Sequence, residues 1–131
     1  MPPAFAAQPP KGRCRVVVID DNQDAAESLA MLLELEGHEV RVAGNGLAGL
    51  ELVRNSDAEV VLIDIGLPDI DGYGVARCIR QQPWGRKLLL VAVSGWGQER
   101  DRQAAADAGF DRHLTKPVDI GELTALLQAA C

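Results

Sequence analysis

The stretch RVVVIDDNQDA, residues 15–25, places an apolar run directly before two adjacent aspartates. The run 16–19 is short and rich in β-branched residues, which is typical of a strand buried on both faces of a sheet. Asp20 and Asp21 then stand at the carboxyl end of that strand. Because neighbouring carboxylates repel each other, the pair indicates a nearby group that neutralises them.

Strand-like and helix-like segments alternate along the rest of the chain. Further apolar runs lie at residues 40–43, 60–63, 88–93 and, more weakly, 110–114. Helical spacing of apolar residues occurs at 25–33, 47–53, 73–80, 98–108 and 120–130, with Asp21 or Asn22 as a cap and Gly37 and Gly109 as stops. Five strands alternating with five helices predict an α/β fold, a doubly wound parallel sheet with helices on both faces.

The composition sets limits on size and partners. Hydrophobic residues make up 47% of the 131 residues, which is enough for the core of one domain. The net charge of −6 and the pI of about 4.8 argue against a nucleic-acid partner. No apolar run is long enough to span a membrane, so we expect no membrane partner. Residues 1–13, MPPAFAAQPPKGR, predict a flexible tail or linker, and residues 14–131 a single domain.

The three cysteines, Cys14, Cys78 and Cys131, are odd in number and far apart. They do not form the closely spaced pairs that are typical of zinc sites. The sequence therefore predicts neither a disulfide nor a zinc site. Free thiols of this kind are typical of a reducing compartment, so we expect a cytoplasmic protein.

Three further polar residues follow the predicted strands. Asp64 ends the run in VVLIDIGLPDIDG, Ser94 ends the run in LLLVAVSGWG, and Lys116 follows the last strand in HLTKPVD. The functional crevice of doubly wound sheets lies at the carboxyl ends of the strands. We therefore expect these side chains to meet Asp20 and Asp21 there.

These residue types together suit the transfer of a phosphoryl group. Three carboxylates need a cation, and carboxylate oxygens with water suit Mg²⁺, with Mn²⁺ as an alternative. A metal, the Lys116 ammonium and the Ser94 hydroxyl can surround the oxygens of a transferring phosphoryl group. Asp64 would then be the nucleophile. The plainer alternatives are that Asp21 caps a helix, Lys116 is a surface lysine and Ser94 is a loop serine.

Four sequence pieces, VIDDN, LIDIGLPDIDGYGVAR, AVSGWG and TKPVD, occur in this order along the chain. Together they resemble the receiver domains of response regulators from two-component phosphorelays, over about residues 14–130. The sequence of these pieces is most similar to receivers of hybrid sensor histidine kinases. The chain is therefore expected to be either a stand-alone receiver or a piece of a longer protein. The resemblance implies a flavodoxin-like (βα)5 fold with strand order 2-1-3-4-5.

The resemblance also implies roles for individual residues. Asp64 matches the phosphoacceptor, and Asp20 and Asp21 match the acidic pair that binds the metal together with Asp64. The backbone carbonyl of Gly66 matches a further metal ligand.

Two residues on the neighbouring strands complete the set that the resemblance implies. Ser94 matches the switch hydroxyl, and Lys116 matches the lysine that pairs with the phosphoryl group. The bond between Lys116 and Pro117 is cis in such proteins.

Two positions depart from the family pattern. His113 stands three residues before Lys116, where the family usually has Tyr or Phe as a rotating switch. An imidazole is smaller and can titrate, which puts the usual aromatic switch in doubt. Gly66 has no side chain that could cover the site. Trp96, two residues after Ser94, is the alternative residue to cover it.

The resemblance implies a signalling switch rather than a turnover enzyme. A phosphohistidine on a sensor histidine kinase or phosphotransfer protein would dock near the first helix and phosphorylate Asp64. The adduct would draw Ser94 toward it and change the face of the fourth helix, fifth strand and fifth helix, which a downstream partner reads. We expect Arg100, Arg102, Arg112 and His113 near that face.

Three alternative functions fit the sequence less well. A pseudo-receiver would bind partners without phosphorylation, but the complete set of site residues argues against it. A haloacid-dehalogenase-like phosphatase usually needs a second Asp two residues after its nucleophile, where this chain has Gly66. A flavin-binding protein of the same fold would need a phosphate-cradling loop that the sequence lacks.

Overall fold

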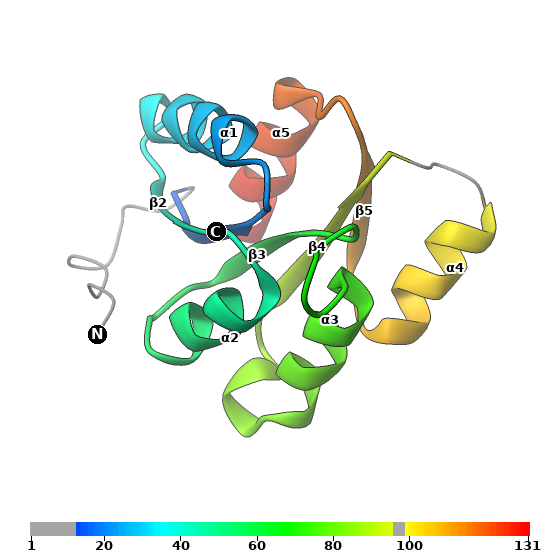
Figure 1. The fold of residues 1–131 in the computed structure, drawn as a ribbon. Helices are drawn as coiled ribbons and strands as arrows, with labels where there is room; N and C mark the ends of the chain where they lie inside the picture. Colours follow the sequence, from blue (N-terminus) through cyan, green and yellow to red (C-terminus); the bar gives the residue numbers. More distant parts are fainter. Residues whose placement is uncertain (1–12, 96–98) are drawn as a thin grey trace.

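The computed structural model describes residues 13–95 and 99–131, where five strands alternate with five α-helices (Figure 1). Except for Arg13, the predicted tail lies outside the described residues, as does Trp96. The elements are β1 (Arg15–Ile19), α1 (Gln23–Leu35), β2 (Glu39–Ala43), α2 (Gly46–Arg54), β3 (Val60–Asp64), α3 (Gly72–Gln81), the 3₁₀ turn η1 (Pro83–Gly85), β4 (Leu89–Ser94), α4 (Glu99–Ala108), β5 (Arg112–Thr115) and α5 (Ile120–Ala130).

The five strands form one parallel sheet in the order β2-β1-β3-β4-β5. Val16 on β1 lies opposite both Val40 on β2 and Val60 on β3, so the central strands begin level with one another. All the strands run in the same direction, so their carboxyl ends meet on one side, the carboxyl end of the sheet. The opposite side is the amino end. This arrangement confirms the expected fold class and strand order.

Helices cover both faces of the sheet, with α1 and α5 on one face and α2, α3 and α4 on the other (Figure 1). Leu62 and Leu123 belong to the first core and Ile63 and Ile79 to the second, and all four are buried. Each fully buried side chain of this kind contributes roughly 1.5–3 kcal/mol. Since alternate residues of a strand point to opposite faces, a strand between two cores is apolar throughout.

Local sequence signals explain where the helices begin. Four helices have a cap residue whose side chain accepts a hydrogen bond from a backbone N–H three positions ahead. These residues are Asn22, Asn45, Asp71 and Asp119. Helix α1 is followed by Gly37, whose φ of +95° lies in the left-handed region that favours glycine. The predicted stop at Gly37 is therefore confirmed.

The last strand begins later than its apolar run suggests, because Phe110 lies in the turn that caps the end of α4. Gly109 has a φ of +108°, and the N–H of Phe110 donates back to the carbonyl of Ala105 at 3.0 Å. This geometry closes a helix, and it buries the Phe110 ring in the core beside α3 and α4. The strand itself covers Arg112–Thr115.

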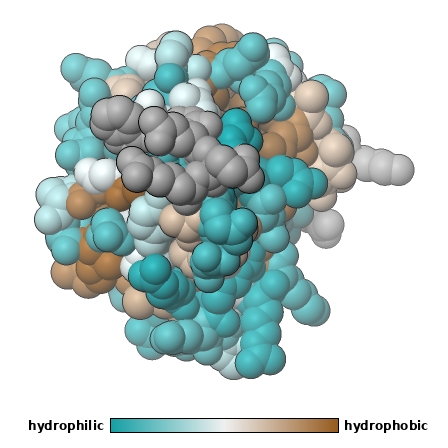
Figure 2. Space-filling model, turned by 90° about the vertical axis from the view of Figure 1, so that its right-hand side faces the viewer, coloured by the Kyte–Doolittle hydropathy of each residue, from teal (hydrophilic) through white to brown (hydrophobic). Residues whose placement is uncertain are grey.

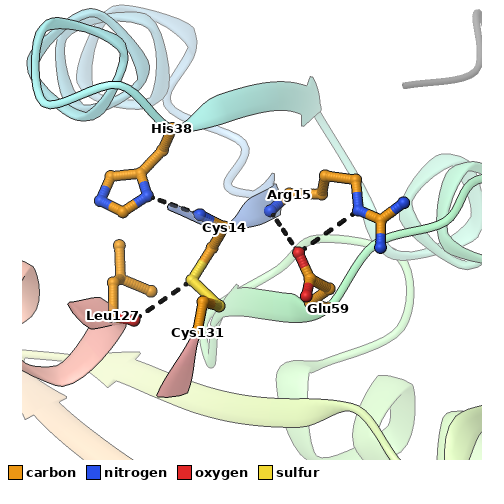
Figure 3. The surroundings of a disulfide bond; sticks show 6 residues. All are labelled: Cys14, Arg15, His38, Glu59, Leu127 and Cys131. Carbon is orange, nitrogen blue, oxygen red and sulfur yellow. Dashed lines mark hydrogen bonds and ion pairs between the residues drawn. A yellow bond between two sulfur atoms is a disulfide. The ribbon is translucent and has the colours of Figure 1, made fainter. Parts of the chain in front are cut away.

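The prediction that no disulfide forms is wrong, because Cys14 and Cys131 are bonded to each other (Figure 3). Cys14 directly precedes β1, and Cys131 directly follows α5. Since α5 runs back from the carboxyl end of the sheet to the amino end, residues 117 positions apart meet with their Cα atoms 5.6 Å apart. Spacing along the chain does not reveal this meeting. The inference of a reducing compartment from cysteine usage therefore loses its basis.

Among the described residues, no helix combines the length and the apolar character that crossing a membrane requires.

Candidate functional site

Three carboxylates meet at the carboxyl end of the sheet, as the sequence predicts. Asp20 follows β1 directly, and Asp64 is the last residue of β3, the strand beside it. Ile19 lies opposite Ile63, so the residues that follow them come side by side. One carboxylate oxygen each from Asp20, Asp21 and Asp64 lie within 4.8 Å of one another.

Lys116 supplies a positive charge to this cluster from the other side. Its Nζ lies 3.3 Å from Oδ2 of Asp64 and 3.8 Å from Oδ2 of Asp20. The backbone N–H of Lys116 donates to the Ser94 carbonyl at 2.7 Å, which joins the ends of β4 and β5. The peptide bond between Lys116 and Pro117 is cis, as the resemblance implies.

The backbone fixes the orientation of the two buried carboxylates in the same way. The N–H of Asn22 donates to Oδ1 of Asp20 at 2.9 Å, and the N–H of Gly66 donates to Oδ1 of Asp64 at 3.1 Å. Each carboxylate therefore has one oxygen held by an amide two residues further on and the other turned toward Lys116. Gly66 is exposed, so it leaves the space beside Asp64 open.

The cluster carries more negative than positive charge. Asp20 and Asp64 are buried, whereas Asp21 is exposed. Burial raises the pKa of Asp20 above its usual range, and the Asp64 carboxylate adds to this effect, while the Asn22 N–H and Lys116 oppose it. A single ammonium faces three carboxylates, and such a set of oxygen donors fits a hard divalent cation.

A cavity of about 580 Å³ opens beside the cluster, between α1 and the start of α5. Its polar part is formed by Asp20, Asn22, Asp64 and Lys116. Its apolar wall includes Leu29 and Leu32 of α1. The carboxylates are therefore reachable from a side that is otherwise apolar.

Ser94 and His113 are hydrogen-bonded to each other on neighbouring strands. His113 lies opposite Ala92, two residues before Ser94, so Ser94 and His113 point to the same face. The Oγ of Ser94 and Nε2 of His113 are 2.9 Å apart. The sequence singled out both residues but did not predict this bond. The parallel register of β4 and β5 is the feature from which this bond could have been predicted.

The surroundings of the His113 ring favour its neutral form over its charged form. Burial lowers its pKa, the Arg102 guanidinium on α4 lowers it further, and Asp101 opposes this. Nδ1 is buried and has no hydrogen-bond partner within the described part of the chain. A neutral imidazole can either donate to the serine hydroxyl or accept from it.

Two of the arginines expected near the face formed by α4, β5 and α5 lie on the surface. Arg102 on α4 and Arg112 at the start of β5 are both exposed. The side of the molecule that carries α4 presents mainly hydrophilic side chains (Figure 2). The side chain of Arg100 and all of Trp96 lie outside the described residues.

Asp69 has a structural role that the sequence did not reveal. Its carboxylate accepts hydrogen bonds from the backbone N–H groups of Gly46 and Leu47 at 2.8 and 2.9 Å. These two hydrogen bonds lower the pKa of Asp69 to about 2. Asp69 therefore ties the loop after β3 to the start of α2 and takes no part in the acidic cluster.

Comparisons with known proteins agree with this geometry. The sequence pattern of the family described as "Response regulator receiver domain" matches residues 16–128. An uncharacterized 14.6 kDa protein of Leptolyngbya boryana is 37% identical over 116 residues, which are 88% of each chain. Transcriptional regulatory protein TcrA of Mycobacterium tuberculosis is 39% identical over 116 residues, which are 88% of this chain but only 45% of TcrA.

Solved structures show the same fold. The receiver domain of sensor histidine kinase PA1611 from Pseudomonas aeruginosa, solved with magnesium coordinated in its active-site cleft, is 27% identical with a TM-score of 0.81. That match covers 88% of this chain and 95% of the other. Chemotaxis protein CheY4 of Vibrio cholerae has a TM-score of 0.85 at 20% identity, covering 91% and 99% of the two chains, and this likeness concerns the fold alone.

Proposed function

The chain belongs to the family of response regulator receiver domains, and from this premise we propose how its residues serve a phosphoryl-accepting signalling switch. Asp64 is the phosphoacceptor. The observation that carries this proposal is its geometry, since one carboxylate oxygen is fixed by the Gly66 N–H and the other lies 3.3 Å from Lys116 Nζ. A carboxylate oxygen of Asp64 attacks the phosphorus, the bond from phosphorus to the histidine nitrogen breaks, and an acyl phosphate forms.

Lys116 neutralises the charge that develops on the transferring phosphoryl group. Its Nζ already lies between Asp64 and Asp20, so little rearrangement is needed. Oxygen atoms of Asp20, Asp21, Asp64 and the Gly66 carbonyl would hold Mg²⁺, or alternatively Mn²⁺. The bound cation would supply further charge neutralisation. The donor set, together with the magnesium in the PA1611 receiver domain, supports this metal.

Ser94 and His113 form the moving part of the switch. The Ser94 hydroxyl turns its proton toward the acyl phosphate, while His113 Nε2–H donates to the same Oγ. His113 is therefore a positioning residue that passes the movement of Ser94 to β5 and α4. Their 2.9 Å contact supports this coupling. The partner reads the resulting change on the face formed by α4, β5 and α5.

An experiment on the ring of His113 tests this coupling. Beryllofluoride, a phosphoryl mimic, is added in the presence of Mg²⁺ and the nitrogen resonances of His113 are followed. We expect them to shift in the wild type and to stay in place in Ser94→Ala. Equal shifts in the two proteins would contradict the coupling, because the ring would then respond without the serine.

The phosphoryl donor is a phosphohistidine on a sensor histidine kinase or a phosphotransfer protein, acting in the cytoplasm. The cavity beside α1 supports docking there, because Met31, Leu32 and Leu35 present exposed apolar side chains on that helix. Residues 14–131 form the receiver domain, and residues 1–13 form a tail or linker. The domain transfers the phosphoryl group to itself and loses it again, so it is no turnover enzyme.

Intact mass after incubation with acetyl phosphate and Mg²⁺ tests the proposal. We expect one added phosphoryl group on the wild type, and none on Asp64→Asn or without Mg²⁺. Asp57→Asn is the matched control, since Asp57 is an exposed carboxylate outside the cluster, and it should gain the group.

Two results would contradict the proposal. A wild type that gains no adduct and also fails to bind beryllofluoride would favour a pseudo-receiver. Repeated turnover of simple phosphate esters would favour a phosphatase, although Gly66 lacks the carboxylate that such chemistry usually needs.

A further inference from the structure

The bond between Cys14 and Cys131 lies at the amino end of the sheet (Figure 3). The acidic cluster lies at the opposite, carboxyl end. Cys14 leads into β1, which lies between β2 and β3. Cys131 follows the last turn of α5. The bond therefore ties the end of α5 to the interior of the sheet, and the chain it closes comprises every described element.

The surroundings of Cys14 suit both a disulfide and a thiol. Its side chain is fully buried, and its N–H donates to His38 Nδ1 at 2.8 Å. Its Sγ lies 3.3 Å from the carbonyl oxygen of Leu127 (Figure 3). A disulfide sulfur has no proton, so in that state this is a contact only. A thiol in the same place can donate to the Leu127 oxygen, so reduction leaves no buried donor without a partner.

Cys131 is the more exposed of the two bonded cysteines. It is half-buried, and it lines a cavity of about 420 Å³ together with Glu59, Lys87 and Ala130. The charge of Glu59 is paired with Arg15, whose Nε lies 3.3 Å from Oε1 of Glu59. Lys87 places an exposed ammonium beside this cavity, opposite in charge to an anionic thiol or disulfide.

From this arrangement we propose that Cys14 and Cys131 form a reversible thiol–disulfide site, which low-molecular-weight thiols such as glutathione open at Cys131. A thiolate attacks Sγ of Cys131 and the bond between the two protein sulfurs breaks. The electron pair stays on Cys14, which takes up a proton. A second thiolate then attacks the mixed disulfide and releases Cys131. The protein gains two hydrogens, two thiols become one disulfide, and a low-molecular-weight disulfide reverses the exchange.

The oxidised form holds α5 against β1, and the reduced form releases the end of that helix. A cross-link that closes a long chain restricts the unfolded state, so oxidation also stabilises the fold. The site lies at the opposite end of the sheet from Asp64, so its chemistry is independent of the proposed phosphorylation. The acetyl phosphate adduct should form on both redox forms.

Equilibration in buffers of set ratios of reduced to oxidised glutathione tests the proposal. Alkylation and peptide mass mapping then report each cysteine. We expect Cys14 and Cys131 to become protected together, in a single transition that reverses. Cys78 is free and half-buried, so it serves as the internal control and should appear only as an alkylated thiol or as a mixed disulfide with glutathione. Alkylation of Cys14 and Cys131 as thiols in fully oxidised buffer would overturn the proposal.

Single serine variants test which sulfur is attacked. With oxidised glutathione, Cys14→Ser should trap a mixed disulfide at Cys131, whereas Cys131→Ser should trap none at the buried Cys14. A mixed disulfide at Cys14 instead would overturn the assignment.

Thermal unfolding tests whether the disulfide stabilises the fold. The variant is Cys131→Ser, because this half-buried residue tolerates a small polar replacement. Reduction should lower the Tm of the wild type by about 10 °C. The Tm of Cys131→Ser should match that of the reduced wild type in both buffers. A wild-type Tm that does not respond to reduction would contradict this stabilisation.

Discussion

The two ends of the same five-stranded sheet differ in how their charged groups are balanced. At the carboxyl end, Asp20, Asp21 and Asp64 cluster beside an open cavity, and the Lys116 ammonium lies near Asp20 and Asp64. At the amino end the groups are matched, since Arg15 pairs with Glu59 and Arg80 with Asp111. The amino end is built to hold the chain together, whereas the carboxyl end is built to receive a ligand.

The difference has an energetic meaning. Burial raises the pKa of Asp20, so its charged form destabilises the folded protein at neutral pH. A ligand that binds only the folded state offsets this destabilisation. Carboxylates whose pKa is shifted in this way concentrate at functional sites. At the amino end the Arg15–Glu59 and Arg80–Asp111 ion pairs each join one positive and one negative group. Substitutions at the two ends should therefore separate stability from activity.

The largest effect on stability is expected at Arg80, which joins several segments at the amino end. Its guanidinium donates to the carbonyls of Gly85, Leu88 and Gly109 and lies 2.7 Å from Oδ2 of Asp111. Arg80→Met should lower the free energy of unfolding by about 3 kcal/mol, because these partly buried acceptors lose a charged donor. Urea unfolding measures the change.

Arg77→Met is the matched control, since Arg77 lies on the same helix and is exposed. It should change stability little. If Arg80→Met were as stable as this control, the hydrogen bonds and the ion pair of Arg80 would not be what holds these segments together.

The next effect concerns activity at the carboxyl end. Lys116→Met should slow the uptake of a phosphoryl group from acetyl phosphate about a hundredfold, because the developing charge loses its ammonium. Time-resolved intact mass measures the rate. Lys87→Met removes an exposed ammonium near the amino end and should leave the rate unchanged. Equal rates in the two variants would mean that the position of the charge does not matter.

A smaller effect is expected from the metal. Mg²⁺ at ten times its dissociation constant should raise the free energy of unfolding by about 1.4 kcal/mol, because it relieves the repulsion among the carboxylates. Asp21→Asn should reduce this gain, whereas Asp57→Asn should retain it. Thermal unfolding with and without Mg²⁺ measures the difference. A gain that survives in Asp21→Asn would place the cation elsewhere.

The smallest effect is expected from pH. Burial lowers the pKa of His113 and of His38 below their ordinary value of 6.5 in the folded protein. Below pH 6.5 the unfolded chain therefore binds more protons than the folded one, and stability falls as the pH falls. His38 sits beside the disulfide, where Nδ1 accepts the N–H of Cys14. Each end of the sheet thus contributes one histidine to this loss.

His113→Phe separates the two contributions, because it removes the histidine at the carboxyl end and retains His38. Between pH 7 and 5, in buffer without Mg²⁺, it should lose less stability than the wild type. Urea unfolding at several pH values measures both losses. If His113→Phe and the wild type lost the same amount, His113 would not remain neutral in the folded protein.

The sequence by itself determined the local elements and the placement of the candidate site. Apolar periodicity located the strands and helices, capping residues such as Asn22 marked helix starts, and Gly37 and Gly109 marked helix ends. The site followed because Asp64 and Lys116 occur at strand ends, and parallel strands bring such ends together. These signals act within a few residues, so they can be read along the chain.

Only the tertiary structure decided which distant groups meet. The return of α5 to the start of β1 paired Cys14 with Cys131, against the prediction from their spacing. The register of β4 and β5 placed His113 on Ser94, and the loop after β3 placed Asp69 on the start of α2. Each of these pairs depends on how elements pack across the sheet, and residue spacing along the chain carries no measure of that packing.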